Sequence, residues 1–308
     1  MMFKEPHLWV KPSNILLLGS IVILFMFIPA TSIYSQNGDI QLNNDISLNP
    51  NITESEKLED LGLYSVYQSL EMEITKIMDI AHQSMNLTNS FGNFPIVNLT
   101  TDMQQQHRGI PSDQDIDKRN EAKKLLADNP SLSFIGMNFP NGDTYFSEPY
   151  YPSQANSSVA NYGYREHIIG AQESSQPYLS NVITAASTGK PIAVLATPIF
   201  SDKTTNSTLV GMLALGLNFT HFNEMIKSID NNDTRILLLD NNGTEISDSA
   251  SNNNISESFD GLQSFKNAKG GELGLIMENI NGRNMTISYA PIDFAQTKWI
   301  LLSISHNS

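Results

Sequence analysis

The side chains that most often carry catalysis do not fall into a catalytic spacing in this chain. Its six histidines are scattered, at positions 7, 82, 107, 167, 221 and 306. No pair has the His-Glu-x-x-His spacing of a zinc hydrolase, and no Gly-x-Ser-x-Gly turn presents a nucleophilic serine. Carboxylates are numerous, but the sequence alone pairs none of them. We therefore predict a protein that is not an enzyme and that binds no metal or cofactor.

The composition excludes several further kinds of site and argues against some classes of partner. The chain contains no cysteine, which excludes disulfides, thiolate metal sites and a cysteine nucleophile. Its formal net charge of −14 argues against nucleic acid and anionic lipid as partners, because phosphate groups repel such a surface. Gly189-Lys190 is not a phosphate-binding loop, because no glycine-rich stretch precedes it. We expect these two residues in a hairpin turn.

One apolar run, residues 15–30, lies near the start of the chain, and no charge occurs between Lys11 and Asp39. Lysines precede the run and carboxylates follow it, which predicts a membrane span over 12–34 with residues 1–11 in the cytoplasm. The alternative is a secretory signal peptide, cleaved at the small residues after the run. Both interpretations place the remaining chain outside the cytoplasm, and we favour the anchor in the cell membrane.

Ten Asn-x-Ser/Thr sequons support export, because N-glycosylation acceptors belong to the surface loops of exported proteins. An Asn-, Ser- and Thr-rich surface could also generate such sequons by composition alone. They begin at Asn51, Asn86, Asn98, Asn156, Asn206, Asn218, Asn232, Asn242, Asn254 and Asn284.

After a polar linker over 35–54, an apolar stripe predicts one long helix over 55–88. The stripe consists of Leu63, Tyr67, Leu70, Ile74, Ile77, Ala81 and Met85. A helix of this length is too long for one small domain, so we expect it to run alongside two. A free coiled coil is the alternative, and the helix offers a surface for a homodimer.

Two units of similar order follow the helix. The first combines short helices over 114–127 and 165–175 with strands over 132–139, 144–149, 177–185, 191–200 and 207–217; residues 89–111 are expected to be irregular. The second combines helices over 219–229 and 259–268 with strands over 234–240, 244–249, 272–280, 284–292 and 299–305. The order predicts an α+β fold with two tandem antiparallel sheets.

Several short motifs, in order and spacing, resemble the double Cache domain, the extracytoplasmic PAS-like sensor of chemoreceptors and sensor kinases. They are Tyr164-Arg165, Pro177-Tyr178-Leu179-Ser180, Ser187-Thr188-Gly189-Lys190-Pro191, Ala196-Thr197-Pro198-Ile199, Leu209-Val210-Gly211-Met212-Leu213 and Tyr289-Ala290-Pro291-Ile292 with Trp299. The resemblance covers about residues 55–305. It implies a membrane-distal PAS-like module over 89–220 and a membrane-proximal one over 221–305.

The resemblance also implies a ligand site in the distal module. Arg165 matches the arginine with which amino-acid-binding members hold a ligand carboxylate. The family's aromatic pair falls on His167 and Ile168, and its two acidic residues fall on about Ala185 and on Gly216. Without those acids an ammonium group lacks a counter-charge. We therefore expect an anion or a neutral polar ligand, such as a small carboxylate.

The expected ligand-binding residues are Arg165, Tyr164, Tyr162 and His167, and each has a structural alternative. Arg165 could be a surface ion-pair partner at a helix start. The two tyrosines could form a pocket wall or simply cover the sheet. His167 could titrate within a ligand site or have only a structural role.

The resemblance implies a membrane-anchored ligand-binding sensor domain. The chain stops at Ser308, so we expect it to lack an output domain and to act through a separate signalling membrane protein. The alternative is a secreted or anchored envelope or adhesion protein that uses the fold without a small ligand.

Overall fold

The computed structural model describes residues 53–85, 94–151, 161–201, 207–229, 234–250 and 259–306. The predicted cytoplasmic segment, membrane span and nearly all of the linker lie outside these residues. Within the described part of the chain, no helix combines the length and the apolar composition that a membrane crossing needs.

The predicted long helix is present but interrupted. It consists of α1 (Glu54–Asp60) and α2 (Tyr64–Ser84). Four residues of the predicted stripe, Leu70, Ile74, Ile77 and Ala81, are buried on α2 together with Val66 and Ser84. Leu63 is buried just before the helix, whereas Tyr67 and Met85 are half-buried. Residues 86–88 of the prediction lie outside the described chain.

The interruption is a Schellman motif, which the stripe did not reveal. Gly62 has a φ of +67° and its N–H donates to the Glu59 carbonyl at 2.9 Å. The Leu63 N–H donates to the Leu58 carbonyl at 2.9 Å, and both leucine side chains are buried. These paired bonds satisfy the last carbonyls of α1 and end it, so that α2 starts in a new direction.

Five further helices are described: α3 (Thr101–His107), α4 (Ile116–Asp128), α5 (Glu166–Ser174), α6 (Phe219–Ile229) and α7 (Gln263–Lys269). Four of them match predicted helices. The exception is α3, which falls in a segment predicted to be irregular. Its first turn is capped by the Thr100 hydroxyl, which accepts from the Met103 N–H.

The first sheet contains β1 (Leu132–Asn138), β2 (Thr144–Glu148), β3 (Tyr178–Leu179), β6 (Val194–Phe200) and β7 (Leu209–Leu217). All neighbours are antiparallel, in the order β2-β1-β7-β6-β3. The strands predicted over 177–185 and 191–200 are each divided. Their inner halves, β4 (Ile183–Thr184) and β5 (Pro191–Ile192), leave the sheet and pair only with each other.

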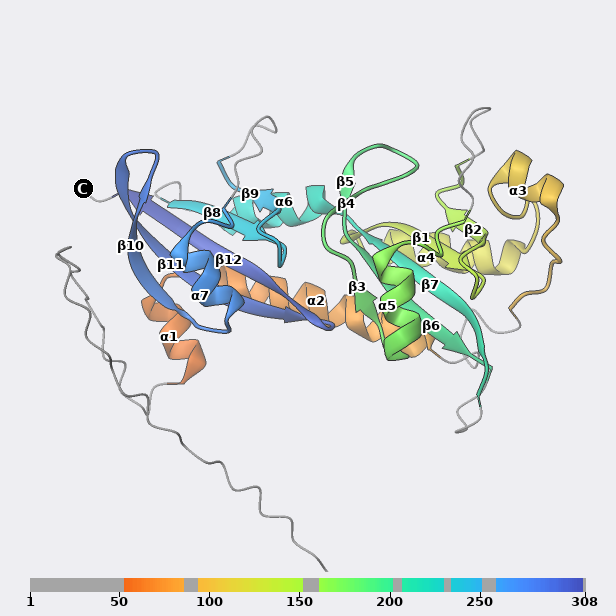
Figure 1. The fold of residues 1–308 in the computed structure, drawn as a ribbon, viewed down its shortest axis with the longest axis horizontal. Coiled ribbons are helices and arrows are strands. Elements are labelled where there is room, and N and C mark those ends of the chain that lie inside the picture. Colours follow the sequence, from red (N-terminus) through yellow and green to blue (C-terminus); the bar gives the residue numbers. More distant parts are fainter. Residues whose placement is uncertain are drawn as a thin grey trace, which may run out of the picture. The chain divides into compact units, whose positions relative to one another are not determined.

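The second sheet contains β8 (Thr234–Leu239), β9 (Glu245–Asp248), β10 (Gly274–Ile280), β11 (Arg283–Phe294) and β12 (Thr297–His306). Its antiparallel order is β10-β11-β12-β8-β9. Counted within each sheet, both follow the order second, first, fifth, fourth, third (Figure 1). The repeat predicted from the sequence is therefore a repeat of connectivity.

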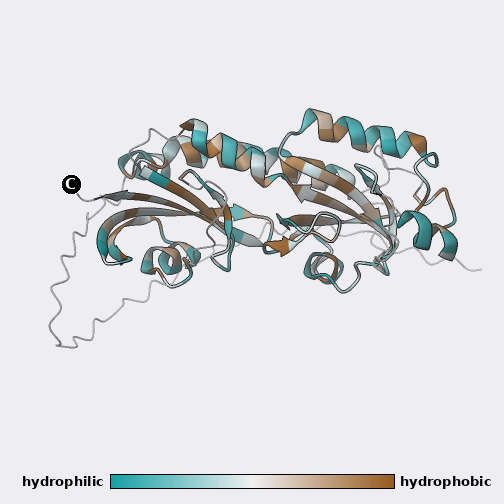
Figure 2. Ribbon diagram, turned by 90° about the horizontal axis from the view of Figure 1, so that it is seen from above, coloured by the Kyte–Doolittle hydropathy of each residue, from teal (hydrophilic) through white to brown (hydrophobic). Residues whose placement is uncertain are grey.

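The core links α2 to both sheets. One cluster of buried apolar side chains contains the α2 stripe together with Leu195 and Leu213 of the first sheet and Leu238 and Trp299 of the second. The brown apolar strands and the apolar side of α2 are visible in Figure 2. On the other face of the second sheet, a separate cluster packs Phe265 of α7 onto the strands.

Candidate functional site

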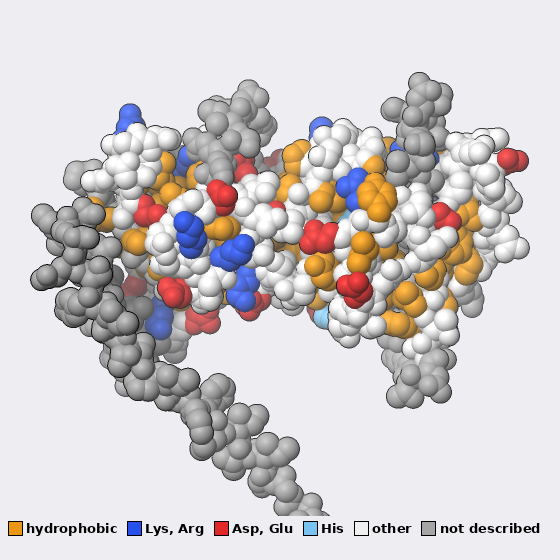
Figure 3. All heavy atoms as spheres, viewed as in Figure 1, with side chains coloured by type: hydrophobic (Ala, Val, Ile, Leu, Met, Phe, Trp, Pro, Cys, Tyr) orange, Lys and Arg blue, Asp and Glu red, His pale blue; other side chains and the backbone are white. Residues whose placement is uncertain are grey.

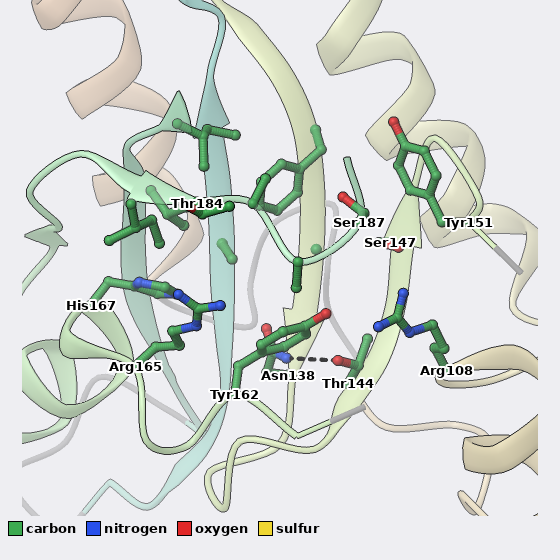
Figure 4. Close-up of a pocket in the computed structure, with 18 of the residues that line it drawn as sticks. Arg108, Asn138, Thr144, Ser147, Tyr151, Tyr162, Arg165, His167, Thr184 and Ser187 are labelled. Atoms are coloured by element: carbon green, nitrogen blue, oxygen red, sulfur yellow. Dashed lines mark hydrogen bonds between the residues drawn. The ribbon is translucent and has the colours of Figure 1, made fainter. Parts of the chain in front are cut away.

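The described chain has a cavity of about 100 Å³ on one face of the first sheet. Strands β1, β2, β6 and β7 form its floor, and the cover comes from α5, the end of α3 and the β4–β5 segment (Figure 4). The lining residues are Arg108, Phe134, Gly136, Asn138, Thr144, Phe146, Ser147, Tyr151, Tyr162, Arg165, His167, Ile183, Thr184, Ala185, Ala186, Ser187, Ile192, Val194 and Ala214.

Small residues in the middle of the sheet create the space. Gly136 of β1 is the cross-strand partner of Ala214 of β7, and both line the cavity. Larger apolar side chains, including Phe134 and Val194, stand around them. The β4–β5 pair, which lies outside the sheet, and the turn after β4 contribute further lining residues, including Thr184, Ala185 and Ser187.

Arg165 lines the cavity, as expected of a ligand-binding residue. It precedes α5 with extended backbone angles, and its N–H donates to the Tyr162 carbonyl at 2.9 Å. Within the described residues its guanidinium has no ion-pair partner, so the surface ion-pair alternative finds no support there. The neighbouring carboxylate, Glu166, instead accepts hydrogen bonds from the Asn181 amide.

The two tyrosines are placed differently. Tyr162 lines the cavity. Tyr164 is 61% exposed and is not among the described lining residues; the Arg165 guanidinium carbon lies 5.3 Å from the centre of its ring. A cation held over an aromatic face is restrained in position. Tyr164 is therefore placed to orient Arg165 from outside, and direct ligand contact by Tyr164 stays a prediction.

His167, the second residue of α5, is buried and lines the cavity beside Arg165. Its Nδ1 is buried without a hydrogen-bond partner in the described structure. Burial, and then the positive charge of Arg165, lower the pKa of His167 to about 4. The imidazole is therefore neutral at pH 7 and has one N–H and one acceptor nitrogen.

Arg108 is the lining residue that sequence reasoning missed most clearly. It comes from the end of α3, in the segment predicted to be irregular, and reaches the cavity from the side opposite Arg165 (Figure 4). The Thr100 cap and the Arg108-Gly109 stop were local signals of a short helix. Nothing in the sequence places this arginine near one that follows 57 positions later.

The charged side chains among the described lining residues are all positive. Two arginines line it, whereas no Asp or Glu occurs among its described lining residues. Ala185, at the first expected acidic position, lines the cavity without charge. At Gly216, a side chain would have no room, because an added Cβ would lie 2.1 Å from the Phe134 ring. Within the described residues, no cluster of His, Asp or Glu could hold a metal ion.

Comparison with known proteins identifies the family. A family model described as Cache domain, of the double Cache type, matches residues 51–307. The chain belongs to the Cache domain family. The match agrees with the predicted fold of two tandem antiparallel-sheet modules. Cache domains are ligand-binding sensor domains. No curated protein sequence matches this chain significantly.

Solved Cache structures share the fold at low sequence identity. An extracellular ligand-binding receptor from Desulfohalobium retbaense is 17% identical, with a TM-score of 0.55 over 82% of this chain and 41% of that one. The ligand-binding domain of the Pseudomonas aeruginosa chemoreceptor PctB with L-Arg is 11% identical, with a TM-score of 0.55 over 82% and 88%. That of the Pseudomonas fluorescens chemoreceptor CtaA with L-isoleucine is 13% identical, with a TM-score of 0.53 over 83% and 96%. At these identities the likeness shows the fold alone, and this chain spans less than half of the Desulfohalobium receptor.

Proposed function

We propose that this chain is a membrane-anchored extracytoplasmic sensor whose distal module binds a small carboxylate, with Arg165 as the main charged anchor. The observation that carries the proposal is the cavity of the first sheet, which is lined by cations and by no described carboxylate. Solved relatives hold amino acids, whose ammonium group needs a negative partner. The described residues that line this cavity include none, so the ligand in this proposal carries an anionic group and no cationic one.

Arg165 suits this role by chemistry and by position. A guanidinium binds a carboxylate through two parallel N–H···O bonds. Tyr164 restrains the guanidinium from outside, and His167 lies next to it inside the cavity. A charge-assisted contact of this kind contributes about 1.5–3 kcal/mol, so its loss weakens binding by about 10- to 150-fold.

The test is a thermal-shift and calorimetric screen of the full-length chain with small carboxylates, amino acids, amines and purines. We expect stabilisation by one or more carboxylates, and a loss of about 10- to 150-fold in affinity in Arg165→Gln. Arg283→Gln is the matched control, because it removes an exposed arginine from the far end of the β10–β11 hairpin. Stabilisation by amino acids, or carboxylate binding unchanged in Arg165→Gln, would contradict the proposal.

A screen in which no small molecule binds would favour the envelope or adhesion alternative. The proposed anchor over 12–34 is tested separately, by membrane fractionation and sequencing of the mature N-terminus. A soluble protein that begins near residues 32–36 would show a cleaved signal peptide instead.

A further inference from the structure

We propose that the ligand is a small 2-hydroxycarboxylate, whose carboxylate binds Arg165 and whose hydroxyl group binds the imidazole of His167. The inference rests on the proposed function, because it concerns the same cavity and the same arginine. It goes further in assigning a second functional group to the ligand and in naming the side chain that recognises it. Three features carry it: a buried histidine nitrogen without a partner, the place of this histidine beside Arg165, and the tight packing of α5.

The imidazole of His167 has a polar atom enclosed in protein. The residue is 6% exposed and lines the cavity, and its Nδ1 is buried without a hydrogen-bond partner in the described structure. Among the described residues that line the cavity, no other side-chain nitrogen or oxygen is buried without a partner. Buried polar groups in folded proteins are nearly always hydrogen-bonded. The imidazole is therefore the lining group that a polar group of the ligand would satisfy.

The protonation state of His167 favours a hydroxyl group as its partner. Burial, and then the positive charge of Arg165, lower the pKa of His167 to about 4, so the imidazole is neutral at pH 7. A neutral imidazole has one N–H donor and one acceptor nitrogen. A hydroxyl group both donates and accepts, so it matches either ring nitrogen, whereas an alkyl chain matches neither. An ammonium group at this place would be repelled by the neighbouring guanidinium.

The closeness of the two side chains places the hydroxyl next to the carboxylate. Arg165 and His167 are two positions apart at the start of α5, and both line the cavity. In Figure 4 the guanidinium and the imidazole lie side by side at the same end of the cavity. A guanidinium can hold both oxygens of one carboxylate through two parallel bonds, which leaves the imidazole for a further group. That group is closest when it is attached to the carbon beside the carboxylate.

The packing of α5 fixes both side chains. An added Cβ at Gly170 would lie 2.3 Å from the ring of Tyr178, so this helix passes directly against β3. On the same helix, Ile168 and Ala171 are buried in one apolar cluster with side chains of β6 and β7. A binding group on a tightly packed helix keeps its position better than one on a loop. Arg165 and His167 can therefore distinguish ligands by the position of a single hydroxyl group.

Other lining groups suit the rest of a short hydroxy acid. Phe134, Ile192 and Val194 offer apolar contact to its alkyl chain, and a cavity of about 100 Å³ accommodates a molecule of a few carbons. The Asn138 amide donates to the Thr144 hydroxyl at 3.3 Å, so these two polar residues engage each other (Figure 4). On the described part of the face that carries α5 and α7, acidic, basic and apolar side chains are interspersed (Figure 3). The choice of ligand is therefore assigned to the enclosed groups.

The test compares 2-hydroxycarboxylates with the acids that lack the hydroxyl group, by titration calorimetry on the full-length chain at pH 7. The pairs are glycolate with acetate, lactate with propionate, and 2-hydroxybutyrate with butyrate. The positional control is 3-hydroxypropionate, which carries its hydroxyl group one carbon further from the carboxylate. We expect at least one 2-hydroxy acid to bind about fivefold or more tightly than its paired acid, and lactate to bind more tightly than 3-hydroxypropionate.

Substitutions assign the preference to a side chain. In His167→Phe, the affinity for the 2-hydroxy acid should fall to that for its paired acid, whose own binding should stay unchanged within error. Arg165→Gln should weaken the binding of both acids by about 10-fold or more. The matched control is His82→Phe, because His82 is an exposed histidine of α2 that is not among the described lining residues. This control should change neither affinity.

The outcomes separate this inference from the proposed function. Equal binding of the 2-hydroxy acids and their paired acids by the unmodified chain would overturn the inference and leave the carboxylate sensor in place. A hydroxyl preference that survives in His167→Phe would overturn the role of His167. The absence of binding by any carboxylate would overturn both proposals. If His167→Phe unfolds, His167→Gln keeps a donor and an acceptor and should retain part of the preference; its complete loss there would contradict the assigned contact.

Discussion

The side-chain amide of Gln296 pairs with both backbone polar groups of Leu179. Its Nε2 donates to the Leu179 carbonyl at 2.7 Å, and its Oε1 accepts from the Leu179 N–H at 2.9 Å. Leu179 belongs to β3, the edge strand of the first sheet, and Gln296 lies in the turn between β11 and β12 of the second. The amide therefore extends the edge of one sheet with a group supplied by the other.

Removal of this amide should weaken the joint between the modules. We expect Gln296→Leu to lower the free energy of unfolding by about 1–3 kcal/mol, because two hydrogen bonds are lost at once. Urea denaturation measures the change. The control is Asp293→Asn near the end of β11, which removes the charge of the exposed Lys298–Asp293 pair at 3.1 Å and should change stability by less than about 0.5 kcal/mol. Equal effects of the two substitutions would contradict this prediction.

The buried Arg119–Glu148 pair should be far more sensitive than an exposed one. Glu148→Gln leaves the fully buried guanidinium without its counter-charge, so we expect a loss of about 3–5 kcal/mol in the free energy of unfolding. Lys76→Gln removes the charge of the lysine in the Lys76–Glu73 pair, whose side chain is 60% exposed, and should cost less than about 1 kcal/mol. Chemical denaturation of both variants tests the contrast, and a cost below about 1 kcal/mol for Glu148→Gln would refute it.

His167 should make stability depend on pH. Its pKa is about 4 in the folded protein against 6.5 for an ordinary histidine, so the unfolded chain binds a proton more readily. Stability contributed by the neutral imidazole is complete above pH 6.5 and is lost as the pH falls toward 4, by about 3 kcal/mol. Urea denaturation from pH 7 to 4 should show a shallower decline for His167→Gln than for the unmodified chain. Parallel curves would show that His167 does not carry this dependence.

The break between α1 and α2 gives a local test of backbone conformation. Gly62 has a φ of +67° and open space where a Cβ would lie, so Gly62→Ala meets no clash but does meet left-handed strain of about 1 kcal/mol. Gly62→Asn should cost less, since asparagine tolerates this conformation. Gly261→Ala is the control, because Gly261 also has open space but no positive φ. Thermal unfolding should rank the variants Gly261→Ala, Gly62→Asn, Gly62→Ala, from most to least stable.

Much of the fold was predictable because its signals are local. The apolar stripe of α2, the apolar strand segments and the turns at Gly142 and Gly243 all depend on residues close in sequence. The break at Gly62 was missed because the stripe begins only at Leu63 and carries no information on the residues before it. The helix α3 was missed because it has no buried residue and hence no stripe.

The site was predictable only in part, because its pieces come from distant segments. Arg165, Tyr162 and His167 lie within six positions, and a family resemblance was enough to bring them together. Tyr164 also lies there, but its position beside the capping residue of α5 turns it outward, which no spacing rule indicates. The approach of Arg108 depends on α3, on the contact of Gly109 with β2 and on the buried Arg119, so it follows only from the folded chain.

The apolar side of α2 has a consequence for cooperativity. This helix and residues of both sheets form one apolar core. If one module unfolds, the other therefore loses part of the apolar packing that keeps its own core buried. The two modules should therefore melt in a single calorimetric transition, with equal van't Hoff and calorimetric enthalpies. Either sheet produced without this helix would present an uncovered apolar face and would self-associate. The two modules, which look like separate domains in the sequence, therefore fold as one cooperative unit.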